Sequence, residues 1–147
     1  MKQERLDQIL LRLGYVTDDE IKQALMRQKA HGGRIGSHLL YFKFISEDEL
    51  VQALSAQHGV PGFRLDDHEI SPAAVKKLPY EIAQDFQVIP IDHNRASKTV
   101  TIAVVDPGDR DMIDKVKKAF HATSVVMYVA PESLVRMLVT QDCSLSR

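Results

Sequence analysis

Residues 5–28 read RLDQILLRLGYVTDDEIKQALMRQ, and residues 34–57 repeat the pattern as RIGSHLLYFKFISEDELVQALSAQ, 29 positions later and without gaps. Self-similarity at a fixed spacing is typical of a repeated supersecondary unit. The aligned positions match arginine with arginine at the start, leucine pairs in the middle and glutamine with glutamine at the end. The first part of the chain is therefore predicted to hold two copies of one small folding unit.

Each copy predicts a short helix, a turn and a longer helix. The apolar residues between positions 6 and 13 recur at helical spacing and stop at Gly14, which we expect to cap the first short helix. Residues 17–20, TDDE, and residues 46–49, SEDE, have the form of a capping box. In that motif a hydroxyl accepts from the backbone three residues on, while the glutamate reaches back. The two longer helices are predicted to begin there.

Both longer helices carry an apolar stripe that predicts one buried face. The stripes consist of Ile21, Ala24 and Leu25 in the first copy and Leu50, Ala53 and Leu54 in the second. The link between the copies, residues 29–33, contains two adjacent glycines and is short enough to keep the copies adjacent. We expect four helices in a small bundle, with equivalent residues in pseudo-symmetric positions that suit a two-fold ligand.

The pattern changes at residues 59–62, Gly-Val-Pro-Gly, because proline and glycine mark a break between folding units. We therefore divide the chain into a tandem helical subdomain, 1–58, and a small α+β subdomain, 59–147. The polar tail beyond Thr140 is expected to be frayed or a linker.

The second subdomain shows short helical and β-branched segments in turn. They predict helices at 72–78, from 79, at 112–120 and at 131–139, and strands at 88–91, 99–105 and 124–129. The first two strands are predicted to form a hairpin around the polar residues 92–98. The fold class of the whole chain is predicted to be α+β, with a four-helix tandem-repeat subdomain followed by a three-stranded sheet covered by helices.

The composition excludes several classes of function. Lys and Arg number 19 against 20 Asp and Glu, so no excess of positive charge favours general nucleic-acid binding. Cys143 is the one cysteine, which excludes an internal disulfide and suits a reducing cytosol. The N-terminus lacks the apolar stretch of a signal peptide, and no segment approaches the roughly 20 apolar residues that span a bilayer. We expect a cytoplasmic protein that reaches a membrane only through a partner.

Motifs for catalysis and metal binding are missing from the sequence. No Gly-x-x-x-x-Gly-Lys-Ser/Thr pattern is present to hold a nucleoside triphosphate, and no nucleophile stands with a base. The six histidines include no pair at i, i+4 that would indicate a metal site. The sequence therefore predicts a non-catalytic protein with no metal and no cofactor.

The tandem pattern Arg-Leu-Gly-x-x-Leu-Leu-x-x-Gly, continuing to Leu-x-x-x-Leu-x-x-Gln, resembles the MshEN motif of the type II secretion and type IV pilus assembly ATPases. Residues 78–83, 88–91 and 101–107 look like the remainder of the same domain, also described as GspE N-terminal-like. The resemblance covers roughly residues 4–140. It implies a site for cyclic di-GMP in the tandem repeat and a contact with the cytoplasmic part of an inner-membrane platform protein.

The resemblance and the repeat together give a set of candidate ligand contacts. Arg5 and Arg34 lead this set, because a guanidinium can contact the O6 and N7 edge of guanine, stack on its face or bind phosphate. Each arginine could instead be solvated or pair with a nearby acid such as Glu4. Gln28 and Gln57 could hydrogen-bond the ligand or the backbone of the preceding short helix. The candidate residues are Arg5, Leu6, Leu10, Gly14, Leu25, Gln28, Arg34, Ile35, Gly36, Leu39, Leu54 and Gln57.

Two positions depart from the motif. Asp7 stands at the first glycine of the first copy, where its carboxylate would repel a bis-phosphate ligand unless a cation intervened. Lys43 stands at the second glycine of the second copy, where it could contribute a favourable charge but is costly in a left-handed conformation. Gly14 and Gly36 preserve the other half of each pair.

The sequence leaves three functions open. The leading hypothesis is a regulatory module that binds cyclic di-GMP through the repeat and acts on a secretion or pilus ATPase. The second is a docking adaptor, without the nucleotide, for an inner-membrane platform protein or another partner. Tyr41, Phe42 and Phe44 favour this adaptor if they are exposed. The third is a plain structural domain, which needs neither surface.

Overall fold

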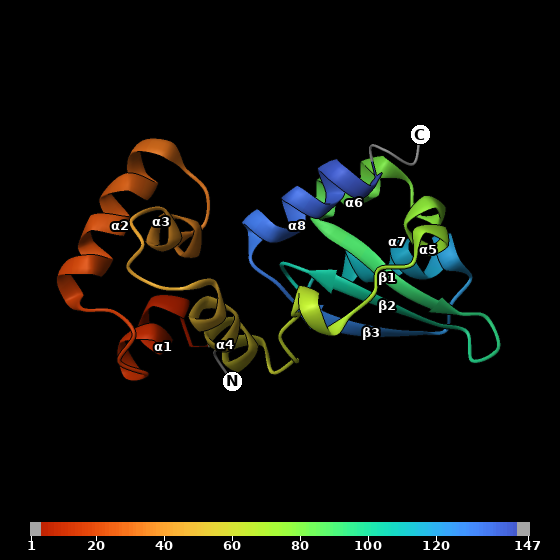
Figure 1. The fold of residues 1–147 in the computed structure, drawn as a ribbon, viewed down its shortest axis with the longest axis horizontal. Coiled ribbons are helices and arrows are strands. Elements are labelled where there is room, and N and C mark those ends of the chain that lie inside the picture. Colours follow the sequence, from red (N-terminus) through yellow and green to blue (C-terminus); the bar gives the residue numbers. More distant parts are fainter. Residues whose placement is uncertain (1–3, 144–147) are drawn as a thin grey trace. The chain divides into compact units, whose positions relative to one another are not determined.

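The computed structural model describes residues 4–143. The chain divides into two compact units, the first ending at Gly59 and the second beginning at Val60. Figure 1 shows helices alone in the first unit, and a sheet with helices in the second.

The first unit contains the four predicted helices. They are α1 (Leu6–Arg12), α2 (Asp18–His31), α3 (Ile35–Tyr41) and α4 (Glu47–His58). Both capping boxes are confirmed: the Thr17 hydroxyl accepts from the backbone N–H of Glu20, and the Ser46 hydroxyl accepts from that of Glu49. The longer helices therefore begin where local hydrogen bonding dictates.

The two copies exchange their packing partners. α1 makes its main contacts with α4, and α3 makes its main contacts with α2, so each short helix packs on the longer helix of the other copy (Figure 1). The residues buried between them include Ile9, Leu10, Ala24, Leu39, Leu50 and Ala53. Neither copy has a complete core without the other, so the repeat folds as one interlocked unit.

Two details of this unit differ from the prediction. α2 continues to His31, so the non-helical part of the link is shorter than residues 29–33. The apolar stripe of α2 is also narrower than predicted, because Leu25 is 38% exposed. Helical spacing alone does not show where the packing partner of a helix ends.

The short helices end in the same way, although one position is glycine and the other lysine. Gly14 has a φ of 78° and Lys43 a φ of 62°, both in the left-handed region. The residue that follows, Tyr15 or Phe44, donates its backbone N–H to a carbonyl of the preceding short helix, at 3.0 Å in both cases. This is the Schellman arrangement, in which glycine is favoured because it has no Cβ. Lys43 adopts the costly conformation that the sequence led us to expect.

The second unit confirms the α+β prediction. Its main elements are α5 (Pro72–Lys77), α6 (Tyr80–Phe86), β1 (Val88–Asn94), β2 (Thr99–Val104), α7 (Arg110–Phe120), β3 (Ser124–Val129) and α8 (Glu132–Leu138). A 3-10 turn (Leu65–Asp67) precedes them and a π-helical turn (Val139–Cys143) follows them. The sheet has the order β1-β2-β3, with β1 antiparallel and β3 parallel to the central β2.

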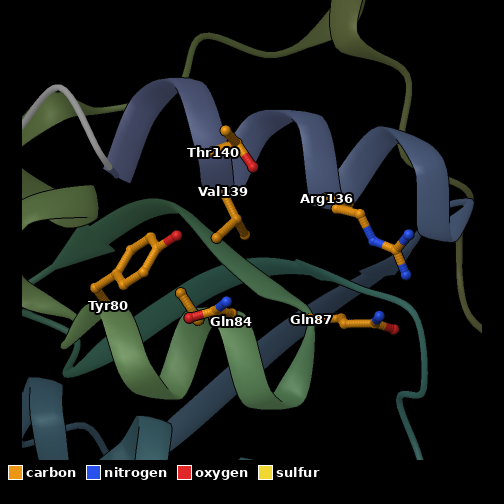
Figure 2. A pocket seen from close by; sticks show the side chains of 7 residues that line it. Tyr80, Gln84, Gln87, Arg136, Val139 and Thr140 are labelled. Atoms are coloured by element: carbon orange, nitrogen blue, oxygen red, sulfur yellow. The ribbon is translucent and has the colours of Figure 1, made fainter.

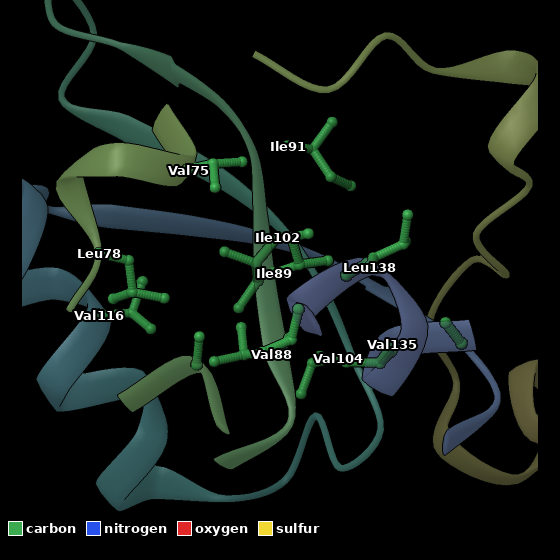
Figure 3. Packing of buried hydrophobic residues seen from close by; sticks show 14 of the residues in the cluster. Val75, Leu78, Val88, Ile89, Ile91, Ile102, Val104, Val116, Val135 and Leu138 are labelled. Atoms are coloured by element: carbon green, nitrogen blue, oxygen red, sulfur yellow. The ribbon is translucent and has the colours of Figure 1, made fainter. Parts of the chain in front are cut away.

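Helices cover both faces of this sheet. Ile102 and Ala103 are adjacent on β2 and both fully buried, and adjacent residues of a strand point to opposite faces. Figure 3 shows side chains from α5, α7 and α8, such as Val75, Val116 and Val135, meeting around the strands. The sheet is therefore the core of the second unit.

Several boundaries in this unit differ from the prediction. β1 runs to Asn94 through a bulge between Pro90 and Asp92, so the hairpin turn is shorter than residues 92–98. α7 begins at Arg110, because Asp109 caps it by accepting from a backbone N–H 3.1 Å away. Helical backbone continues to Cys143, where a frayed tail was expected. The side chain of Cys143 and residues 144–147 lie outside the described part.

Replacing Lys43 with glycine is expected to raise the free energy of unfolding by about 1 kcal/mol, because the left-handed backbone costs an L side chain about that much. Chemical denaturation of the variant and the parent chain measures the difference. Gly14→Lys is the matched reverse change, since no atom lies within 4 Å of a Cβ added at position 14. It should lose a similar amount, and a Lys43→Gly variant no more stable than the parent would contradict this account.

His93 on β1 predicts a pH dependence of stability. Its ring packs edge-on against Phe120, with the centroids 4.9 Å apart. Burial and then the charges of Lys77 and Arg95 lower the pKa of His93, outweighing Asp92 and a backbone hydrogen bond. The unfolded state, with a pKa of about 6.5, then binds more protons, so the free energy of unfolding should decline as the pH falls below about 6.5.

The check is denaturation at about pH 7.5 and about pH 5.5, on either side of the ordinary histidine pKa. The parent chain should lose more stability on acidification than His93→Gln, which has no proton to gain in this range. An equal loss in the two chains would rule out His93 as the source.

Candidate functional site

Arg5 and Arg34 occupy equivalent positions in the first unit. Each is the residue directly before a short helix, α1 or α3, and each has extended backbone, with φ and ψ of −71° and 148° or −92° and 146°. Both side chains are exposed. The two arginines therefore repeat the same local geometry, as the alignment of the copies implied.

Gln28 and Gln57 fix the backbone in front of these arginines. The side-chain N–H of Gln28 donates to the carbonyl of Gly33 at 2.9 Å, and that of Gln57 donates to the carbonyl of Glu4 at 3.3 Å. Each glutamine thus holds the residue that precedes the other copy's arginine. The sequence had offered the backbone of the preceding short helix as a partner; for Gln28 the partner is the turn that leads into the following one.

A buried histidine, His38, adds a second support to the turn before Arg34. It is 4% exposed, and its Nε2 lies 2.7 Å from the carbonyl of Gly32. Its Nδ1 lies 2.8 Å from the guanidinium of Arg27, which can only donate, so Nδ1 accepts and Nε2 carries the proton. Sequence reasoning considered the histidines only as metal ligands. The available signal was a histidine aligned with Ile9 of the first copy, a position on the buried face of the short helix.

Gly36 permits close packing at the start of α3. A Cβ built on it would lie 2.9 Å from one methyl group of Leu50 and 3.5 Å from one of Leu6. Its backbone does not have a positive φ, so the requirement for glycine here is space rather than conformation. At Gly14 the requirement is instead for the left-handed backbone conformation, because a Cβ there would have no atom within 4 Å. The two motif glycines that this chain keeps therefore have different physical roles.

Asp7 is at the position of Gly36 in the first copy, and it contacts an arginine of the candidate site. Its carboxylate lies 3.1 Å from the guanidinium of Arg5, with side-chain exposures of 14% and 68% respectively. The sequence had named Glu4 as an example of an acid that could pair with Arg5. Glu4 pairs instead with Arg12, at 2.9 Å.

The apolar candidates separate into two groups. Leu10, Leu39 and Leu54 are buried, so in this structure they can form only a floor beneath the surface. Leu6 and Ile35 are half-buried, and Leu25 is 38% exposed. Only this second group presents apolar surface beside the arginines and glutamines.

The aromatic residues after α3 form a small cluster. The rings of Phe42 and Phe44 stack at 5.1 Å, and Tyr41 meets Phe42 edge-on at 5.3 Å. Tyr41 is 62% exposed, and the guanidinium of Arg27 lies 3.6 Å above its ring. Of these three aromatic residues, only Tyr41 offers a large exposed surface.

The second unit contains a cavity of about 360 Å³ that sequence reasoning did not predict. Figure 2 shows side chains from α6 and the residue after it facing those of α8 and the π-helical turn. Arg136 is the one cationic residue in the lining of this cavity, and its guanidinium forms an ion pair with Glu132 at 2.5 Å. The lining residues are Tyr80, Ala83, Gln84, Gln87, Arg136, Val139 and Thr140.

Among residues 4–143, no three described His, Cys, Asp or Glu side chains are grouped so that they could hold a metal ion. No helix within the same range has the length and the apolar character needed to cross a membrane.

Comparison with known proteins gives a consistent set of similarities. Residues 58–146 match the family model of the MshEN domain. The type IV pilus assembly ATPase PilB of Myxococcus xanthus (strain DK1622) is 33% identical over 113 residues, which cover 77% of this chain and 20% of that protein. Bacteriophage adsorption protein B of Escherichia coli (strain K12) is 33% identical over 86 residues, or 58% of this chain and 11% of that protein.

Structural similarity extends over both units. The solved structure of MshE with cdg has a TM-score of 0.70 and 27% identity, covering 95% of this chain and 99% of that chain. The family model begins at the end of the tandem repeat, whereas the structural match covers 95% of the chain and so includes the repeat. The chain spans a fifth or less of the length of the two curated relatives.

The variant Gly36→Ala tests the close packing of α3 against Leu50 of α4. The added methyl group would lie 2.9 Å from Leu50, so we expect a loss of about 1–3 kcal/mol in the free energy of unfolding, as overpacking usually costs. Gly108→Ala is the control, because its added Cβ would meet only Asp106 Oδ1 at an ordinary 3.5 Å. Equal denaturation midpoints for the two variants would show that the contact at Gly36 relaxes freely.

Proposed function

Because the chain belongs to the MshEN domain family, we propose that it is a non-catalytic regulatory and coupling module of a bacterial type II secretion or type IV pilus system. Its tandem repeat, residues 5–28 and 34–57, is the binding site for cyclic di-GMP. Similarity to a pilus assembly ATPase supports the choice of machinery. The structure of MshE with cdg, which we take as cyclic di-GMP, supports the choice of ligand.

The observation that carries this proposal is the matched placement of Arg5 and Arg34. Each stands directly before a short helix, and each follows a carbonyl held by a glutamine of the other copy. Cyclic di-GMP has two guanines and two phosphates related by a two-fold axis, so a two-fold site can meet both halves in the same way. A guanidinium suits either group, since it donates bidentately to guanine O6 and N7 or to phosphate oxygens.

The remaining candidates shape the surface around the arginines. Leu6, Ile35 and Leu25 provide apolar contacts for the bases, and Gln28 and Gln57 border the same positions. Buried Leu10, Leu39 and Leu54 support that surface from beneath. Gly14 ends α1, and Gly36 brings α3 close to its neighbours.

The proposed module has no motor of its own. The sequence has no phosphate-binding Gly-x-x-x-x-Gly-Lys-Ser/Thr pattern in residues 1–147, so ATP hydrolysis would need residues outside this range. Ligand binding to the helical unit changes how the module engages a secretion or pilus ATPase or an inner-membrane platform protein. This action takes place in the cytoplasm, with recruitment to the inner membrane through the partner.

A docking adaptor without nucleotide is the second candidate, favoured by the exposure of Tyr41. Tyr41 is 62% exposed and the Arg27 guanidinium lies over its ring, and Met26, the residue before Arg27, is 72% exposed. Aromatic residues, methionine and arginine are enriched at protein interfaces. This surface can serve an inner-membrane platform protein whether or not the nucleotide binds.

Isothermal titration calorimetry with cyclic di-GMP tests the proposed site. We expect the parent chain to bind and both Arg5→Ala and Arg34→Ala to bind more weakly, because a bidentate arginine contact contributes about 1–3 kcal/mol. Arg110→Ala, an exposed arginine of the second unit, is the matched control and should bind like the parent. No heat at tens of micromolar ligand would reject the nucleotide site and leave the docking adaptor.

A further inference from the structure

The two copies differ in charge at the position two residues after each candidate arginine. Asp7 in the first copy aligns with Gly36 in the second, so a carboxylate stands on one side where no side chain exists on the other. The difference also has a steric cause, because a Cβ added at Gly36 would lie only 2.9 Å from a methyl group of Leu50. An acid at this position of the second copy would therefore have to displace the Leu50 side chain.

The Asp7 carboxylate pairs with the Arg5 guanidinium, which is the group proposed to bind the ligand. Its Oδ2 lies 3.1 Å from Nη2 of Arg5, whose N–H donors are those proposed to contact guanine or phosphate. The Asp7 side chain is 14% exposed while that of Arg5 is 68% exposed, so the acid is mostly covered and the guanidinium is open to solvent. A ligand that binds Arg5 must therefore compete with the Asp7 carboxylate for its N–H donors.

We propose that Asp7 is an internal competitor for Arg5 and thereby weakens the binding of cyclic di-GMP by the first copy of the repeat. This inference rests on the proposed function and identifies Asp7 as the residue that limits the affinity for the ligand. Asp7 acts in two ways: it occupies the donors of Arg5, and its negative charge repels the ligand phosphates. The chain then responds only to higher ligand concentrations than a repeat with glycine at both positions would need.

The experiment measures cyclic di-GMP affinity for Asp7→Asn, which keeps the shape of the side chain and removes its charge. We expect binding to tighten about two- to fivefold, the range that an exposed ion pair can contribute. Glu4→Gln is the matched control, because it removes a nearby negative charge whose partner is Arg12 rather than Arg5. It should leave the affinity close to that of the parent.

A double variant separates competition for Arg5 from simple repulsion. In an Arg5→Ala background the Asp7→Asn gain should shrink, because no arginine is left to release. If the parent binds while Asp7→Asn binds equally or more weakly, Asp7 is not a competitor and the nucleotide site stands. If neither the parent nor Asp7→Asn binds, the nucleotide site and the inference both fail.

Discussion

The exchange of partners between the two helical copies is the constraint on which the first unit depends. Each short helix packs on the longer helix of the other copy, and each glutamine at the end of a longer helix holds a carbonyl in front of the other copy's arginine. A single hydrogen bond of this kind adds only about 1 kcal/mol to stability. Its larger effect is geometric, because it sets where Arg5 and Arg34 leave the backbone.

This arrangement explains how sequence repetition places Arg5 and Arg34 equivalently and where the equivalence of the two copies is lost. Lys43 replaces a glycine and still adopts the left-handed backbone, so the end of the short helix keeps its shape at some cost. Asp7 replaces a glycine and introduces a charge beside Arg5. The backbone symmetry therefore survives both changes, while the electrostatic symmetry does not.

Local rules predicted most of the fold, and tertiary contacts account for the rest. The capping boxes and the α+β class follow from interactions within a few residues or from hydrophobic periodicity, and the left-handed backbone at Lys43 follows from its place at a motif glycine. Resemblance on the repeat motif predicted the family, which the match over residues 58–146 confirms. The exposure of Leu25 and the extension of β1 through a bulge depend on neighbours that periodicity does not identify.

The candidate site shows the same division. The equivalence of the arginines could be read from the alignment, but three contacts could not. They are the pairing of Asp7 with Arg5, the hold of Gln28 on the following turn, and the link from His38 to Gly32 and Arg27. These contacts join residues two to eleven positions apart and depend on side-chain geometry that the alignment of the copies does not specify. The role of these residues in ligand binding remains a proposal.

The most direct test of the two-copy site is a nuclear magnetic resonance titration of the labelled chain with cyclic di-GMP. The account predicts shift changes in two stretches 29 positions apart, residues 4–7 and 33–36, and in the side-chain amides of Gln28 and Gln57. Changes confined to residues 60–143, or no changes at tens of micromolar ligand, would contradict it.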